Sequence, residues 1–286
     1  MPRIQAGDIS LNYRETGKGD RIVVFVHGNL GCIDWMDLVW LALPPDIHVF
    51  AFDWRGCGDS DKPEPTADYD NYSMTQHAQD MIAAIRNVGI KKCHLANHST
   101  GGIIGTRMLL MEPAMFGKVL CLDPVAPASV PFDENGIKLF QAMKESYEFA
   151  YSILAGTSPS LFTVESMQPG QVPQFSDKAT VEQRDLFQRI VKKTRGLSDG
   201  IWFGTPVNLT KEHQSGELKR RQKEIRHEHL ILWGEHDVWI PKGDLEAMAA
   251  AMPQCALKIL PHTGHCMNLE NPAGFAQIFV EFFQQD

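Results

Sequence analysis

The chain has 286 residues, and its length and composition limit the kinds of protein it encodes. Apolar residues make up 43% and charged residues 22%, the usual balance of a globular protein with a sizeable core. A net charge of −8 argues against a nucleic-acid or anionic-membrane partner, and no apolar run is long enough to span a bilayer. The N-terminal residues lack the apolar stretch of a signal peptide, and the six cysteines form no C-x-x-C pair. We therefore expect reduced thiols and a cytoplasmic protein.

Strand and helix patterns alternate through the first half of the chain. Residues 4–5 and 9–13 read as a strand hairpin, and the wholly apolar run Ile22–Val26 is typical of a central parallel strand buried on both faces. A helix is expected over Asp34–Leu43 and a buried strand over Ile47–Phe52. Ser73 then fits the N-cap of an amphipathic helix that Gly89 ends.

The stretch Leu95–Gly102 places a serine between a strand and a helix. An apolar run precedes Ser99, and a helical pattern follows the glycines. This is the context of the G-x-S-x-G nucleophile elbow, a strained turn that lifts a serine hydroxyl clear of the sheet. Asn97 replaces the first glycine of that motif, so the packing beside it must leave room for a larger side chain.

Two later stretches complete a recognisable order of serine, acid and histidine. Leu230–Asp237 reads as a strand that ends at a carboxylate, and Gly264-His265 follows a further strand over Ala256–Pro261. Together with the elbow, these motifs resemble the α/β-hydrolase family, and the resemblance covers almost the whole chain. The other segments that carry it are His27-Gly28 and the loop Asp53-x-Arg55-Gly56-x-Gly58-x-Ser60, interpreted as a structural turn.

The resemblance implies a catalytic triad of Ser99, Asp237 and His265. It also implies that the backbone N–H groups of Asn29 and Thr100 form the oxyanion hole. Asp123, at the end of the strand Val119–Leu122, competes for the role of the acid, and Glu235 is a weaker rival. Three further histidines are less suited to be the base. His27 belongs to the oxyanion loop, His98 adjoins the nucleophile, and His262 precedes the Thr263-Gly264 turn.

Strand signals fade after Pro124, and helical ones dominate to about residue 216. Apolar residues at three- and four-residue spacing predict one amphipathic helix over 140–154, and Thr180 fits the cap of a second. As the resemblance implies, we interpret 125–216 as a helical cap on a core formed by 1–124 and 217–286, with a mostly parallel central sheet flanked by helices. Predicted substrate-binding residues are Leu30, His98, Met143, Tyr147, Trp202, Trp239 and Met267, and Phe162 and Phe203 are further candidates.

The resulting hypothesis is a cofactor-independent serine hydrolase, without a metal, that cleaves a carboxylic ester or lactone of a small, largely apolar molecule. The serine disfavours the epoxide and halide reactions of relatives that use an aspartate at the elbow. Three alternatives stay open: hydrolysis of a C–C bond in ring-cleavage products, a perhydrolase or haloperoxidase type, and a small-molecule receptor with slow turnover. Cys266-Met267 departs from the sequence typical of the C–C bond hydrolases. Asn29-Leu30 departs from the oxyanion loop typical of the perhydrolase or haloperoxidase type. We expect a monomer or homodimer.

Overall fold

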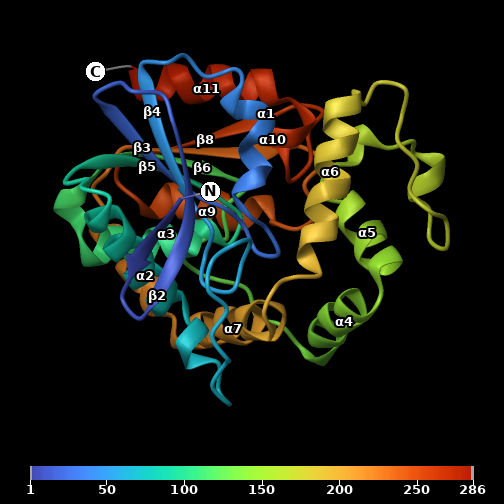
Figure 1. Ribbon diagram of the computed structural model, residues 1–286, viewed down its shortest axis with the longest axis horizontal. Coiled ribbons are helices and arrows are strands. Elements are labelled where there is room, and N and C mark those ends of the chain that lie inside the picture. Colours follow the sequence, from blue (N-terminus) through green and yellow to red (C-terminus); the bar gives the residue numbers. More distant parts are fainter. Residues whose placement is uncertain (1, 285–286) are drawn as a thin grey trace.

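A single eight-stranded sheet forms the centre of the computed structural model, which describes residues 2–284 (Figure 1). The strand order is β1-β2-β4-β3-β5-β6-β7-β8; β2 pairs antiparallel with both β1 and β4, and all other pairs are parallel. The predicted mostly parallel sheet is therefore confirmed. The strands are β1 Arg3–Ala6, β2 Ile9–Thr16, β3 Arg21–Val26, β4 Ile47–Phe52, β5 Cys93–His98, β6 Phe116–Leu122, β7 His229–Gly234 and β8 Cys255–Leu260.

Strand β3 shows why the sheet needs helices on both faces. Its apolar residues alternate between two hydrophobic clusters: Val24 and Val26 belong to one cluster, and Val23 and Phe25 to the other. Successive side chains of a strand point to opposite faces, so each face of the sheet carries its own core. A strand buried on both faces reads as a continuous apolar run, as this one does.

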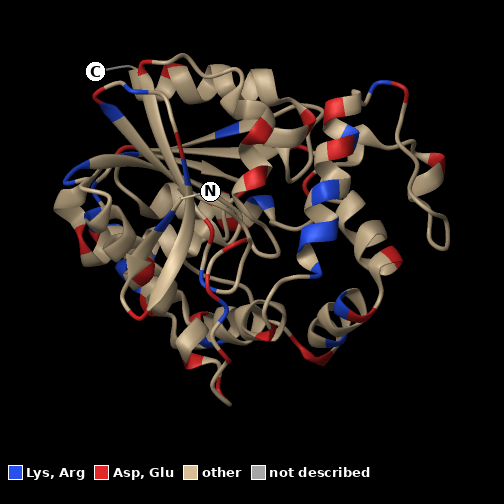
Figure 2. Ribbon diagram, viewed as in Figure 1, with Lys and Arg blue, Asp and Glu red and all other residues tan. Residues whose placement is uncertain are grey.

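The helices divide between the two clusters. Helices α2, α3 and α9 pack with the first cluster, which contains Val24 and Val26, and α1 and α11 pack with the second, which contains Val23 and Phe25 (Figure 1). Helix α10 contributes to both, through Leu269 and Met267. Figure 2 shows that the charged residues lie mainly on helices and loops and that the central strands carry few. The helices are α1 Asp37–Trp40, α2 Met74–Asn87, α3 Gly101–Met111, α4 Glu134–Glu145, α5 Tyr147–Ala155, α6 Val181–Thr194, α7 Thr205–Ser215, α8 Glu217–Arg221, α9 Lys242–Ala251, α10 Met267–Glu270 and α11 Pro272–Gln284.

Helices α4 to α8 all lie between β6 and β7 in the chain, and α4 to α7 stand beside the sheet rather than on it (Figure 1). The division into core and cap stays a prediction. The single helix expected over 140–154 is wrong, because the chain forms two helices that meet at Ser146. This residue is extended and its hydroxyl accepts the N–H of Phe149 at 3.1 Å, which starts a new helix.

The helix expected over Asp34–Leu43 is also shorter than predicted. A 3-10 turn over Ile33–Met36 leads into α1, which has a single turn. The N–H of Ile33 donates to the Asp53 carboxylate at 2.8 Å, so the loop after β4 holds the start of this segment. Among residues 2–284, no helix is both long and apolar enough to cross a membrane.

Candidate active site

Ser99 occupies a strained turn between β5 and α3. Its φ of +53° lies in the left-handed region, which a residue with a Cβ adopts only at a cost of about 1–2 kcal/mol. Its N–H donates to the carbonyl of Leu122 at 3.0 Å, and its carbonyl accepts the N–H groups of Gly102 and Val125. The neighbouring strand β6 and the loop after it therefore hold the turn in place.

Small residues around the turn make this close packing possible. A Cβ on Gly101 would lie 2.4 Å from the carbonyl oxygen of Val26, and one on Gly28 would lie 2.8 Å from the Cβ of Ser99. Asn97, at the position of the missing motif glycine, has its amide beside Gly105 of α3 and donates to the Cys121 sulfur at 3.3 Å. A glycine on the helix thus provides the room that the larger side chain needs.

Asp237 and His265 form a buried pair at the ends of β7 and β8. The Nδ1 of His265 lies 2.8 Å from Oδ2 of Asp237, and the other carboxylate oxygen accepts the N–H groups of Trp239 and Ile240. Burial opposes ionisation of Asp237, but His265 and the Trp239 N–H hold its pKa below the usual value. The carboxylate thereby fixes Nδ1–H as the protonated ring nitrogen and leaves Nε2 as the acceptor.

Asp123, the rival acid, lies beside this pair. Asp123, Asp237 and His265 each place a nitrogen or oxygen within 4.8 Å of the others. Asp123 is fully buried, its Oδ1 accepts the Gly234 N–H at 2.9 Å, and its Oδ2 has no hydrogen-bond partner within residues 2–284. Burial, with the nearby charge of Asp237, raises the pKa of Asp123 well above its usual value. Of the two carboxyls, Asp123 therefore holds a proton more readily than Asp237.

Two backbone N–H groups are available beside Ser99. Asn29 and Thr100 line the same cavity as the serine, and within the described chain neither N–H donates a hydrogen bond. His27 orders the loop that carries Asn29: Nδ1–H donates to the Gly28 carbonyl at 2.8 Å, and the ring stacks on Trp54. Two backbone N–H groups that are free to donate into one cavity can stabilise the negative charge that develops on a carbonyl oxygen in the transition state.

His98 supports His265 rather than replacing it. Its Nε2–H donates to the backbone carbonyl of His265 at 2.9 Å, and the two ring centroids are 4.7 Å apart. Burial, with the neighbouring His265, lowers the pKa of His98 to about 3, so the ring stays neutral. The other rivals, His262 and Glu235, are exposed at the surface.

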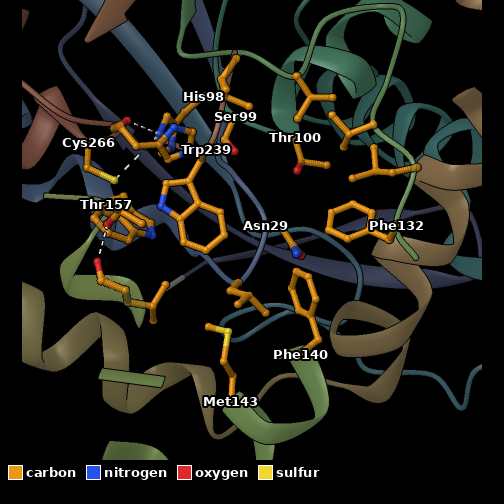
Figure 3. A pocket seen from close by; sticks show the side chains of 18 residues that line it. Asn29, His98, Ser99, Thr100, Phe132, Phe140, Met143, Thr157, Trp239 and Cys266 are labelled. Atoms are coloured by element: carbon orange, nitrogen blue, oxygen red, sulfur yellow. Dashed lines mark hydrogen bonds between the residues drawn. The ribbon is translucent and has the colours of Figure 1, made fainter. Parts of the chain in front are cut away.

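A cavity of about 120 Å³ opens in front of Ser99 (Figure 3). Four of the seven predicted substrate-binding residues line it, namely Leu30, His98, Met143 and Trp239. Among the described residues, no Lys, Arg, Asp or Glu contributes to the lining. A cavity of roughly 150 Å³ lined by aliphatic and aromatic groups holds benzene, so this one fits a small uncharged group.

Tyr147, Trp202 and Met267 do not line this cavity in the part of the chain that the structure describes, and neither do Phe162 and Phe203. Tyr147 lies on α5 next to Tyr151, with ring centroids 6.3 Å apart. Trp202, in a π-helical turn over Gly200–Gly204, is buried in the first hydrophobic cluster, and Met267 is buried in the second. These side chains pack between elements outside the cavity lining, and their predicted role in substrate binding stays a prediction.

Other lining residues were not predicted as substrate-binding. Phe140 and Leu154 share the apolar stripe that contains Met143, so the spacing was a usable signal. Cys266 lines the cavity in place of its neighbour Met267. Of the rest, Leu209 lies in the middle of α7 and Trp35 in the 3-10 turn Ile33–Met36. The others come from loops that no periodic pattern marks: Val125, Val130, Phe132, Thr157 and Ile240.

A parallel sheet with a strained serine turn after β5 defines the class of protein as an α/β hydrolase. The model of the Alpha/beta hydrolase family matches residues 23–278. The chain therefore belongs to this family, as its resemblance implied.

Curated and solved relatives agree with this assignment. The chain is 23% identical over 285 residues to a 2-hydroxy-6-oxononadienedioate/2-hydroxy-6-oxononatrienedioate hydrolase of Burkholderia vietnamiensis, covering 97% of this chain and 92% of the relative. The enol-lactonase of Burkholderia xenovorans LB400 superposes with a TM-score of 0.77 at 17% identity, over 99% of this chain and all of the other. The esterase EaEST of Exiguobacterium antarcticum gives a TM-score of 0.77 at 21% identity, over 99% of both chains. The two solved structures show the fold alone.

Proposed function

We propose that the protein is a cofactor-independent serine hydrolase that cleaves a carboxylic ester or lactone of a small, largely apolar molecule. The observation that carries the proposal is the convergence of four features on one cavity: the serine turn, the His265–Asp237 pair, two unpaired N–H groups and an uncharged apolar lining. We also propose a monomeric or homodimeric protein of the cytoplasm, with a small molecule as its partner; six free cysteines support that setting.

Each step assigns one role to one group. The Ser99 oxygen attacks the carbonyl carbon while Nε2 of His265 takes its proton, and the N–H groups of Asn29 and Thr100 stabilise the oxyanion. His265 then gives the proton to the leaving alkoxide, which departs as an alcohol and leaves an acyl group on Ser99. Water, deprotonated by the same imidazole, releases the acid. In a lactone the alcohol stays attached to the acyl group.

The test is hydrolysis of p-nitrophenyl acetate and butyrate, followed by intact mass after a fluorophosphonate probe. We expect turnover and a single adduct in the wild type, and loss of both in Ser99→Ala. Ser215→Ala, an exposed serine at the end of α7, is the control and should behave as wild type. Unchanged ester hydrolysis in Ser99→Ala would falsify the proposal. An adduct without turnover would favour a slow receptor.

A C–C bond hydrolase is the second candidate, and the likeness to the Burkholderia vietnamiensis hydrolase favours it. That relative is named for a dioate, a substrate with two carboxylates. The described lining of this cavity supplies no Lys or Arg to pair with a carboxylate, which is why we place the ester or lactone first. Comparing kcat/KM for a ring-cleavage dioate with that for neutral esters and lactones separates the two. A higher kcat/KM for the dioate would make C–C bond hydrolysis the first candidate.

A further inference from the structure

Three exposed side chains meet at the ends of β7 and β8, on the surface beside the candidate active site. Glu235 and His236 directly follow β7, and His262 lies two residues after β8. One ligand-type atom of each lies within 4.8 Å of the other two, and the two imidazole centroids are 6.4 Å apart. Two imidazoles and one carboxylate are a donor set that zinc and similar metals use.

Backbone hydrogen bonds hold the two chain segments that carry these side chains. The N–H of Glu235 donates to the Leu260 carbonyl at 2.9 Å, and the N–H of His236 donates to the Thr263 carbonyl at 2.8 Å. The Glu235 carboxylate also accepts the backbone N–H of His262 at 3.2 Å. The relative position of the three residues is therefore set by the fold, and only side-chain rotation remains to be fixed by a ligand.

His262 adopts a backbone conformation that few residues other than glycine adopt, although histidine is among those that do so more often. Its φ is +60°, in the left-handed region that favours glycine. This turn follows β8 directly and places His262 against Glu235 and His236. Strain of this kind is retained where the surroundings hold it, and it gathers at functional sites.

We propose that Glu235, His236 and His262 bind one divalent transition-metal ion of the zinc type. In a tetrahedral site with bonds near 2.1 Å, the ligand atoms lie about 3.4 Å apart, so small rotations of three exposed side chains complete the geometry. Water takes the remaining position. Imidazole ligands disfavour calcium and magnesium, which prefer oxygen. The inference does not depend on the proposed function.

The metal would join the two loops of the candidate active site. His236 immediately precedes Asp237, and His262 precedes His265 by three residues. An ion held between them connects the segment after β7 to the segment after β8 from the outside. Its binding therefore reduces local opening of both segments without contacting the cavity.

The test measures Zn²⁺ binding to the full chain, freed of metal, by competition with a chromophoric chelator. We expect one Zn²⁺ per chain, and at least about a tenfold weaker affinity in His236→Ala and in His262→Ala, because loss of even a group that orients a ligand costs 10–100-fold. His213→Ala, an exposed histidine on α7, should bind as the wild type. Melting temperatures without metal check that each variant folds.

A second measurement reads the loops directly. Zn²⁺ should slow amide hydrogen exchange over residues 261–265 in the wild type and have no effect on it in His262→Ala. Equal Zn²⁺ affinity in the wild type and both histidine variants would overturn the proposal. So would binding that is lost in Cys255→Ser, the least buried of the six cysteines, and kept in the histidine variants.

Discussion

At the scale of single residues, Asp123 and Asp237 show how burial separates two chemically identical groups. Strands β6 and β7 are neighbours in the sheet, so the carboxyls that follow them meet. Asp237 has a histidine and two N–H partners, whereas Asp123 has one N–H and a buried oxygen without a partner. The environment, not the residue type, therefore assigns the charge to Asp237 and the proton to Asp123.

This assignment predicts the pH dependence of stability in Asp123→Asn. In the unfolded chain Asp123 loses its proton near pH 4, whereas in the folded protein its raised pKa keeps the proton bound to a higher pH. The free energy of unfolding of the wild type therefore falls as pH rises between these two pKa values. Asparagine has no such loss. The free energy of unfolding of the variant, measured in urea from pH 5 to 8, should therefore rise relative to the wild type, by up to about 1.4 kcal/mol per pH unit.

Activity gives a second reading of the same variant. Asparagine can still accept the Gly234 N–H, and its amide N–H can donate to the neighbouring Asp237 carboxylate. Asp123→Asn should therefore keep ester hydrolysis, whereas Asp237→Asn should lower kcat by about 10⁴, as in other triads. A stability difference that stays constant with pH, or loss of activity in Asp123→Asn, would show that Asp123 is ionised in the folded protein.

Gly28 leads to a prediction about access to the nucleophile. A methyl group there would lie 2.8 Å from the Ser99 Cβ, so Gly28→Ala forces the oxyanion loop and the serine turn apart. Displacement of reacting groups by about 1 Å can cost 10²-fold in rate. We expect kcat/KM for p-nitrophenyl butyrate and the rate of fluorophosphonate labelling to fall by about this factor. Gly243→Ala, whose new Cβ meets nothing within 4 Å, is the control; an equal effect in both variants would refute the steric argument.

At the scale of elements, the junction of α4 and α5 depends on one hydroxyl. Ser146 accepts the N–H of Phe149, so Ser146→Ala leaves the start of α5 without its cap. We expect a loss of about 1 kcal/mol, seen as a melting temperature lower by about 2–4 °C. Ser152→Ala, in the middle of the same helix, should change stability by less than about 0.5 kcal/mol. Equal losses in the two variants would mean that the cap does not stabilise the junction.

The same junction shows what the sequence pattern can and cannot predict. Parallel strands were predictable because burial on both faces leaves wholly apolar runs, as in β3. The apolar stripe of Phe140, Met143 and Leu154 continues in phase across Ser146, so periodicity did not reveal the break. The pattern also did not show that Trp202 lies in the first hydrophobic cluster, because an apolar residue type does not reveal which element covers it.

The candidate active site was predictable where short motifs fix the backbone and not where loops meet. The turn at Ser99, the acid after β7 and the histidine after β8 all follow strands whose order the fold determines. The sequence favoured Asp237 over Asp123 only by its position in the chain, because both follow strands and only three-dimensional packing shows their partners. Loop residues such as Val130 and Phe132 line the cavity without any pattern that marks them.

At the scale of the whole molecule, an ionic contact joins α6 to the segment after β3. The Asp34 carboxylate, 8% exposed, lies 2.6 Å from Nζ of Lys193 and 3.4 Å from Nε of Arg189, both on α6. Its neighbour Trp35 lines the cavity. The position of α6 beside the sheet and the shape of the cavity are therefore linked through these two adjacent residues.

Asp34→Asn tests this link. Hydrogen bonds to charged groups contribute about 1.5–3 kcal/mol, so we expect a stability loss of that order and a raised KM for p-nitrophenyl butyrate. Because Lys193 and Arg189 are 32% and 49% exposed, 1 M NaCl should narrow the difference in unfolding free energy from the wild type. Glu134→Gln, which removes an exposed pair with Lys138 on α4, should change stability by less than about 0.5 kcal/mol. Loss of stability with an unchanged KM would show that α6 is anchored at Asp34 but that the anchor does not shape the cavity.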